Sequence, residues 1–268
     1  MATASTPDFE GITLHEVEWE TYCQLRDLEA NHHVRMTYLE GELTLDSGLV
    51  DDEGALTLLD VDWEVYERLR DEEENNHVRM TYLDGTLTIM SPLLVHDLDS
   101  RRFIYVIAAV AKAWRIQFLA VGTTTLRRKG RVNVEGAGKE PDEGFYFGDD
   151  AGRIRGKTDL DLSVDPPPSL AIEVDNTADS KAALATYARI RVPEVWRYDA
   201  RDRTLWFGRL AGEGYEEDDR SLGLPRLTPG LVLEAVQAAR TVCRDELEWH
   251  DWLEAWARSL PAPPEGGA

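Results

Sequence analysis

The sequence predicts a mixed α/β fold: a mixed α+β sheet flanked by helices and preceded by a duplicated N-terminal helix–hairpin. Three observations predict this class: an internal repeat, a long amphipathic helix after it, and strand patterns that alternate with helical ones toward the C-terminus. Helix, hairpin, helix, strands, helix and strands in that order indicate a mixed architecture.

Residues 14–47 and 58–91 are two copies of one segment. At an offset of 44 residues, 21 of the 34 aligned positions are identical. Two copies are too few for a solenoid, which needs several units to bury a continuous core. The repeat therefore indicates a partial duplication.

Each copy predicts a helix followed by a hairpin. In the second copy Val61, Tyr66 and Leu69 recur at helical spacing behind Asp60 or Asp62 as a cap. Alternating residues then surround Asp84-Gly85, a strong hairpin signal, and Glu40-Gly41 takes the same place in the first copy.

The rest of the chain supplies the predicted sheet. A long helix over 96–116 has an apolar stripe formed by Phe103, Val106, Ile107, Val110 and Trp114. Strands are predicted over 118–122, 123–129, 142–147, 170–174, 193–199 and 204–210. Helices are predicted from about Asp179-Ser180, with Leu184, Tyr187 and Ile190 inward, and over 243–256. Residues 149–165 are expected to form a polar loop, and residues 213–220 are expected to form an acidic loop exposed to solvent.

The acidic charge is concentrated near the N-terminus. The net charge is −22, and residues 1–91 carry 22 acids against 5 arginines, a balance of −17. Residues 92–268 carry 29 acids against 24 bases, a balance of −5, with no acid between Ser100 and Val134. The overall charge therefore does not exclude a phosphate-bearing partner.

Other features narrow the class of protein. Two distant cysteines, Cys23 and Cys243, indicate neither a disulfide framework nor a structural zinc. No apolar run reaches membrane-spanning length and no secretory leader is evident, which predicts a cytoplasmic protein without a membrane partner. No phosphate-cradling or dinucleotide glycine motif occurs.

Asp142, Glu173 and Lys181 are the candidate catalytic residues. Asp142 precedes one predicted strand, Glu173 lies inside the next, and Lys181 follows at a helix start. If the two strands pair, the carboxylates can converge at one edge of the sheet and hold Mg²⁺, which prefers oxygen ligands. Such an ion can activate water for attack on a phosphodiester, and a lysine can stabilise the developing charge.

Structural explanations exist for each residue alone. Asp142 is typical of a turn, Glu173 of a half-exposed strand, and Lys181 of a helix start. Three suitable residue types in the required order favour the functional interpretation. Asp175 is a candidate for an extra ligand or a supporting group. His96 could reach the site from the long helix, although a satisfied or exposed histidine is the favoured interpretation.

A basic window after the repeat suggests contacts with nucleic acid. Arg101, Arg102, Lys112 and Arg115 lie on the predicted long helix and could follow a phosphate backbone. Surface bases on a helix are commonly only solubilising, so both interpretations stay open.

Several blocks resemble the Uma2 family of restriction-endonuclease-like proteins. They are E-P-D-E-G-F-Y-F, P-P-P-S-L-A-I-E-V-D, the lysine downstream, Y-A-R-I-R-V-P-E-V-W-R-Y-D, and V-R-M-T-Y-L-D-G-T-L-T-I-M-S-P with His96 after it. The resemblance covers roughly residues 58–233. It implies a PD-(D/E)xK nuclease fold and a Mg²⁺-dependent phosphodiesterase site, with Mn²⁺ as an alternative ion.

The resemblance also implies roles and domains. Asp142 and Glu173 would be metal ligands and Lys181 the catalytic lysine. The superfamily pattern places a lysine two residues after Glu173, where this chain has Asp175. The domains would be 1–57, an acidic segment with the first repeat copy, and 58–268, a Uma2-like nuclease domain. That domain would comprise the second copy (58–91), a catalytic core over about 96–210 and a C-terminal helix over about 243–258.

The leading hypothesis is a Mg²⁺-dependent endonuclease that hydrolyses DNA. The alternative is a non-catalytic module for nucleic-acid or protein interaction on the same fold. A hydrolase acting on RNA or a small phosphodiester is a third hypothesis, since the site chemistry would be the same. A homodimer is compatible with the sequence, although no segment indicates an interface.

Overall fold

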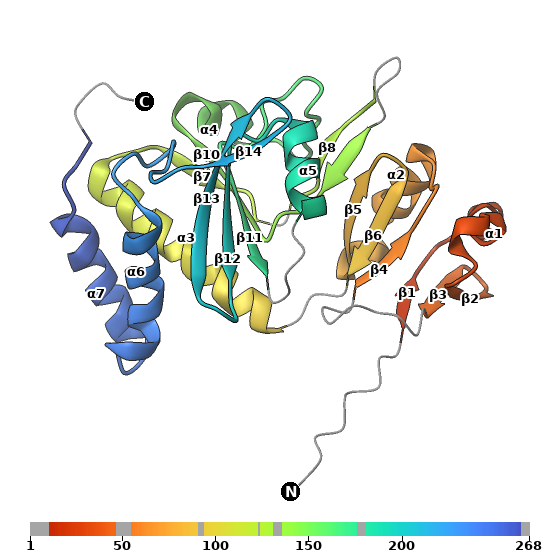
Figure 1. The fold of residues 1–268 in the computed structure, drawn as a ribbon, viewed down its shortest axis with the longest axis horizontal. Coiled ribbons are helices and arrows are strands. Elements are labelled where there is room, and N and C mark those ends of the chain that lie inside the picture. Colours follow the sequence, from red (N-terminus) through yellow and green to blue (C-terminus); the bar gives the residue numbers. More distant parts are fainter. Residues whose placement is uncertain are drawn as a thin grey trace, which may run out of the picture. The chain divides into compact units, whose positions relative to one another are not determined.

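The computed structural model describes residues 11–46, 55–90, 94–122, 124–130, 136–175 and 181–263. The chain forms two compact units, one of residues 1–92 with 131–136 and one of residues 93–130 with 137–268 (Figure 1). Both repeat copies thus belong to the first unit, whereas the sequence-based division places them in different segments. The functional division at residue 57 stays a prediction.

The first unit contains the two repeat copies, and each copy folds as the repeat predicts. The first copy contains β1 (Ile12–Leu14), α1 (Trp19–Asp27), a 3₁₀ turn η1 (Glu29–Asn31), β2 (Arg35–Leu39) and β3 (Glu42–Asp46). The second contains β4 (Ala55–Leu58), α2 (Trp63–Asp71), η2 (Glu73–His77), β5 (Arg79–Leu83) and β6 (Thr86–Met90). In each copy the opening strand pairs antiparallel with the last strand of the hairpin. These opening strands were not predicted because three or four residues carry too little periodicity.

The two predicted hairpin turns are confirmed. Glu40 and Gly41 have φ of 49° and 92°, and Asp84 and Gly85 have φ of 46° and 78°. Positive φ at both central residues defines the tight turn whose twist matches that of antiparallel strands.

The helix of the second copy begins later than its apolar spacing predicts. Asp62 is its N-cap residue, without a side-chain cap bond, and Val61 lies before the helix. The Val61 N–H donates to Gly85 O at 2.9 Å, and its carbonyl accepts from the Tyr82 hydroxyl at 2.8 Å. Val61 therefore ties the entrance of the helix to the hairpin.

A six-stranded mixed sheet forms the centre of the second unit. Its strands are β7 (Phe118–Ala120), β10 (Glu143–Phe147), β11 (Leu170–Asp175), β12 (Glu194–Asp199), β13 (Thr204–Ala211) and β14 (Gly214–Glu217). Their order is β14-β13-β12-β11-β10-β7, and β11 and β12 run parallel while the other neighbours run antiparallel. The parallel pair needs a crossover, which α5 (Lys181–Ile190) supplies. Outside this six-stranded sheet, β8 (Leu126–Arg128) pairs antiparallel with β9 (Ala137–Lys139).

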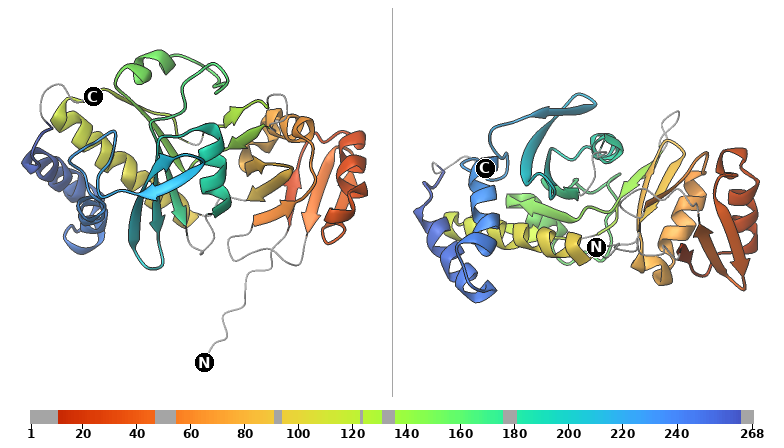
Figure 2. Two further views of the ribbon diagram at one scale, coloured as in Figure 1. Left: turned by 45° about the horizontal axis from the view of Figure 1, so that its top comes forward. Right: turned by 60° about the horizontal axis from the view of Figure 1, so that its bottom comes forward.

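Helices cover the two faces of this sheet differently. The long α3 (Leu94–Trp114), α6 (Pro229–Thr241) and α7 (Glu246–Ser259) share one apolar core with Leu170, Ile172 and Val174 of β11. Side chains alternate between the faces of a strand, so Glu173 points to the opposite face. There α5 lies against the sheet (Figure 2).

Several elements differ from the sequence-based predictions. The predicted polar loop begins with α4 (Gly148–Ile154), and β14 lies within the predicted acidic loop at 213–220. The exposure of β14 left no apolar alternation to detect. Neither β9 nor α6 was predicted, although Thr228 caps α6 and Pro229 opens it. The predicted helix start at Asp179-Ser180 lies outside the described residues.

The structure bears on two expectations from the sequence, which concern membrane-spanning helices and disulfide bonds. Within the described ranges, none of the helices combines the length and the apolar character needed to traverse a lipid bilayer. Cys23 and Cys243 are free thiols.

Glu194 is a buried acid that fixes the chain after β14. Its carboxylate accepts from Trp196 Nε1 at 2.7 Å, Ser221 Oγ at 3.1 Å, and the N–H groups of Leu222 and Gly223 at 3.0 and 3.3 Å. Burial raises the pKa of Glu194 to about 7, and these hydrogen bonds oppose a larger rise.

We expect Glu194 to make stability fall as the pH rises. Its pKa is raised in the folded state, so the stabilisation is complete below the unfolded pKa and is lost as pH rises through about 7. Relative to Glu194→Gln, which cannot ionise, the wild-type free energy of unfolding should fall by roughly 2.5 kcal/mol between about pH 5 and about pH 8. Urea denaturation of both proteins at each pH measures this change, and a constant difference between them would contradict it.

Candidate active site

The pairing of β10 with β11 brings Asp142 close to the part of β11 that carries Glu173. Glu143, the first residue of β10, pairs with Ile172, and Asp142 directly before it accepts a hydrogen bond from the N–H of Val174, the residue after Glu173. This confirms the expected strand pairing. Both strands are interior to the sheet, however, so neither Asp142, directly before β10, nor Glu173, within β11, belongs to an edge strand.

Asp142 is held by the backbone of the neighbouring strand. Its Oδ2 accepts from the N–H of Val174 at 2.7 Å, and the residue is 6% exposed. A carboxylate that accepts a buried backbone N–H is fixed in direction and strongly bonded. The bond therefore aims Asp142 toward the strand that carries Glu173.

Glu173 is held by a lysine and a tyrosine. Lys139 Nζ lies 3.0 Å from Glu173 Oε2, and the Tyr187 hydroxyl donates to Glu173 Oε1. The side chains of Lys139 and Glu173 are each 10% exposed, and the ammonium lies 5.6 Å from the centre of the Tyr187 ring. The acid in this apolar strand is thus explained locally, because it faces away from the apolar core and has charged and hydroxyl partners.

Further acids lie along the same segment. Glu140 and Glu143 are 4% and 6% exposed, and Glu140 Oε1 accepts from Thr125 Oγ1 at 2.9 Å. Residues 139–143 thus place a lysine and three acids beside β11 in a poorly hydrated environment, where electrostatic interactions are strong.

The donor set is compatible with Mg²⁺. Asp142 and Glu173 offer carboxylate oxygens from adjacent strands, and Mg²⁺ in proteins is often bound by one or two carboxylates together with waters and substrate phosphate. Among the residues that the structure describes, no three of His, Cys, Asp or Glu are grouped to hold one metal ion. Such an ion would therefore take most of its ligands from water and substrate.

The other predicted site residues lie around this pair in the sequence. Lys181 begins α5 and Asp175 ends β11, while His96 lies in the first turn of α3. The structure describes the backbone of all three residues but not their side chains. Their predicted roles stay predictions, and the amine that the structure places at Glu173 is that of Lys139.

The predicted nucleic-acid contacts are not brought to the carboxylates. Arg102 and Lys112 lie 3.3 and 2.7 Å from Glu246 and Glu254, so both join α3 to α7. Arg101 and Arg115 are exposed. Because α3 packs on the face of the sheet opposite Glu173, these bases and the acid point to different sides of that sheet.

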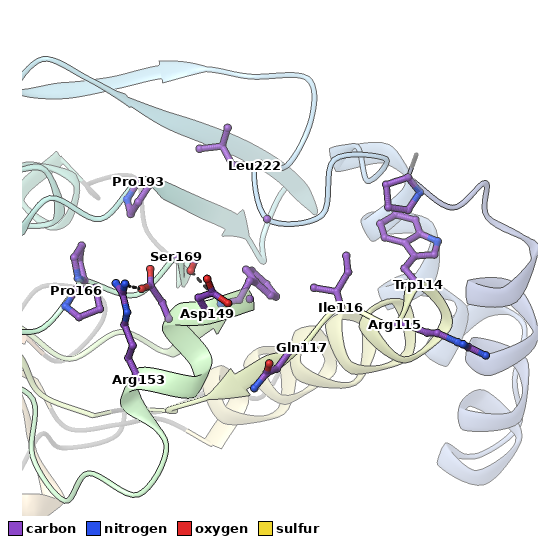
Figure 3. Close-up of a pocket in the computed structure, with 16 residues that line it drawn as sticks. Trp114, Arg115, Ile116, Gln117, Asp149, Arg153, Pro166, Ser169, Pro193 and Leu222 are labelled. Carbon is purple, nitrogen blue, oxygen red and sulfur yellow. Dashed lines mark hydrogen bonds and ion pairs between the residues drawn. The ribbon is translucent and has the colours of Figure 1, made fainter. Parts of the chain in front are cut away.

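A large cavity lies at the other end of β10. It measures about 920 Å³ and opens between the end of α3, α4 and the loops that carry Pro193 and Leu222 (Figure 3). Its lining includes Trp114 and Phe147 but none of the residues around Glu173. The predicted chemistry and the cavity are therefore separate features of the unit.

Sequence reasoning missed the roles of Lys139 and Tyr187. Tyr187 was predicted to be an inward helix residue, which is correct, but its bond to Glu173 depends on how α5 crosses the sheet. Lys139 follows Ala137 and Gly138, which do not form an alternating strand pattern. A charged residue next to Glu-Pro-Asp was the one available signal.

Comparison with protein families identifies the chain. Residues 63–242 match the Uma2 family, described as "Putative restriction endonuclease". The match covers more than half of the chain, and the protein belongs to the Uma2 family of nuclease-like proteins. It begins inside the second repeat copy, which agrees with the expectation that the first copy lies outside the family pattern.

Other comparisons add little. A solved structure described as a "putative nuclease belonging to DUF820", from Anabaena variabilis, has 14% sequence identity and a TM-score of 0.39. The similarity covers 74% of this chain and 99% of that one. A likeness at this level carries no argument about the fold. A comparison with curated proteins finds no match.

We expect Lys139 to stabilise the fold by neutralising Glu173. Lys139→Met leaves a buried carboxylate without its cation and should lower the free energy of unfolding by about 3 kcal/mol. Adding Glu173→Gln removes the uncompensated charge and should recover at least about half of that loss. Urea denaturation of the two single variants and the double variant measures the coupling. Strictly additive effects of the two substitutions would show that the pair is not coupled.

Proposed function

We propose that this Uma2 protein is a Mg²⁺-dependent endonuclease that hydrolyses phosphodiester bonds of DNA. The observation that carries the proposal is the pairing of β10 with β11, together with the bond from the Val174 N–H that holds Asp142, directly before β10, beside the residue that follows Glu173. Membership of a family described as "Putative restriction endonuclease" supports the nuclease class. The proposal consists of the use of Mg²⁺, of DNA as the substrate, and of the roles of the catalytic residues.

Asp142 and Glu173 would hold the metal ion. When bound, Mg²⁺ supplies a Lewis acid for a phosphodiester oxygen and makes a coordinated water more acidic. The protein's contribution is to fix the two carboxylates: Asp142 through the Val174 N–H and Glu173 through the Tyr187 hydroxyl. Fixed acceptors need little reorganisation when they bind a cation.

The two lysines have different proposed roles. Lys139 contacts Glu173 directly and is a positioning residue that sets the direction and charge of that carboxylate. Lys181 is the amine that assists the reaction, as the resemblance implies and as its place at the start of the crossover helix allows. A positively charged amine near the scissile phosphate stabilises the charge that develops there.

Cleavage of supercoiled DNA tests the carboxylates. Wild-type protein with Mg²⁺ should nick or linearise the plasmid, and chelation with EDTA should abolish the activity. Asp142→Asn and Glu173→Gln should each lower the rate by at least about 100-fold, because each removes a charged ligand. Mn²⁺ should substitute for Mg²⁺, since both ions accept oxygen ligands.

The matched control is Asp150→Asn, which makes the same chemical change at the opposite end of β10, where Asp150 pairs with Arg153. It should cut at the wild-type rate. Equal cutting by wild type, Asp142→Asn and Asp150→Asn would indicate a contaminant and exclude this site. Correctly folded wild-type protein without activity on DNA or RNA would favour the non-catalytic interaction module.

The dependence of the cleavage rate on Mg²⁺ concentration distinguishes the proposed roles of Lys139 and Lys181. Lys139→Met removes a cation next to Glu173, so half-maximal cleavage should occur at a lower Mg²⁺ concentration than in wild type. Lys181→Met should lower the rate at saturating Mg²⁺ by at least about 100-fold, with little change in that concentration. Titrating Mg²⁺ against the initial cleavage rate measures both effects. If Lys139→Met lowered the rate at saturating Mg²⁺ and Lys181→Met shifted the Mg²⁺ concentration for half-maximal cleavage, the two proposed roles would be exchanged.

A further inference from the structure

The two repeat copies contact each other reciprocally. Asn31 of the first copy accepts from the N–H of Leu59 at 2.8 Å and donates to its carbonyl at 3.0 Å. Asn75 of the second copy accepts from the N–H of His15 at 2.7 Å and donates to its carbonyl at 3.1 Å. Asn31 and Asn75 are equivalent at the 44-residue offset, and so are His15 and Leu59. Each copy thus gives the other the same contact, as in a two-fold symmetric dimer.

One contact marks the position of the two-fold axis. Arg68 donates to Gln24 Oε1 at 2.7 Å, and these two residues are themselves equivalent at the offset of 44. In a two-fold arrangement, only residues near the axis can touch their own equivalents. The pair therefore supports a pseudo-two-fold relation that the asparagine contacts show independently.

The two copies contribute equivalent residues to one apolar core. Leu14 and Leu58 are both fully buried, as are Leu45 and Ile89, and Leu25 and Leu69 are 0% and 2% exposed. All six belong to one core cluster that both copies share. Apolar residues that lose the copy with which they share a core are exposed, and an exposed apolar patch is typical of an association site.

The first copy lies outside the region that matches the Uma2 family, which begins at residue 63. The second copy therefore carries the family's helix–hairpin, and the first copy shares its apolar core and bonds it through the reciprocal asparagines. Both asparagines are buried, at 1% and 0% exposure, so an uncovered face would also expose polar groups made to bond another copy.

We infer that the face of the second copy that contacts the first copy, around Leu59, Arg68 and Asn75, is a self-association surface. In the intact chain the first copy occupies this face in place of a second molecule of this chain. A tethered partner has an effective concentration on the order of millimolar. Pairing within the chain therefore prevails over pairing between chains at ordinary protein concentrations. If the first copy is displaced, the second copies of two chains pair through the same face. This inference is independent of the proposed nuclease activity.

The side chains on the axis favour pairing between unlike copies. Gln24 accepts a hydrogen bond from Arg68, whereas two second copies would place Arg68 against Arg68. Both side chains are exposed, so this preference is weak and would not prevent association once the apolar face is free.

The test uses the full chain with its first copy displaced. Leu25→Asp with Asn31→Ala places a charge in the shared core and removes one reciprocal contact, while the second copy keeps its sequence. Sedimentation equilibrium should show twice the mass of the matched control His32→Ala, which changes the exposed neighbour of Asn31. An unchanged mass, in a protein whose circular dichroism spectrum keeps most of the wild-type helix and strand signal, would overturn the inference.

A cross-link distinguishes specific pairing from aggregation. In a background of Cys23→Ser and Cys243→Ser, Arg68→Cys places a single thiol at the axis. A short bis-maleimide should join two chains through position 68 when the first copy is displaced, and should not do so when it is intact. Larger species without this cross-link would indicate non-specific association and would also overturn the inference.

A milder variant covers the case in which Leu25→Asp disrupts folding. Asn31→Ala alone leaves every apolar contact in place. Combined with Arg68→Cys in the same cysteine-free background, it should give a concentration-dependent increase in the dimer cross-linked through the introduced thiol. No cross-linking by this folded variant, at concentrations up to the solubility limit, would contradict the proposed surface.

Discussion

The ion pair between Lys139 and Glu173 is the interaction on which the proposed site depends. Glu173 lies in a strand whose alternate residues belong to the apolar core, so its carboxylate requires compensation on the other face. Two elements supply it: β9 carries Lys139, which pairs with Glu173, and α5 carries Tyr187, whose hydroxyl donates to Glu173. Removing one partner of such a pair leaves a poorly hydrated charge, which links the chemistry of the site to the stability of the unit.

The topology of the sheet explains why these elements meet. The parallel pairing of β11 with β12 requires a crossover, and α5 therefore lies on the face that Glu173 occupies. The helices α3, α6 and α7 fill the opposite face with apolar side chains. One face thus stabilises the unit and the other carries the ionisable groups. The basic residues of α3 belong to the stabilising face, where Arg102 and Lys112 bond acids of α7.

Much of the fold could be predicted from periodicity and turn chemistry, as the two hairpins, the long helix and the strand around Glu173 show. Elements without such signals could not: β14 is exposed, and β1 and β9 are three residues long. The helix α6 was missed although Thr228 and Pro229 mark its start. In the site, the order of residues indicated Asp142 and Glu173, because adjacent strands pair. Lys139 could not be found in the same way, because its contact with Glu173 joins residues 34 positions apart through tertiary structure.

Crystals grown with Mn²⁺ would test the central claim most directly, because anomalous scattering locates this ion independently of activity. The account predicts an anomalous peak within coordination distance of both the Asp142 and Glu173 carboxylates, at roughly 2.0–2.6 Å from their oxygens. An ordered crystal with both carboxylates well defined, Lys139 still bonded to Glu173 and no peak between the two acids would contradict it.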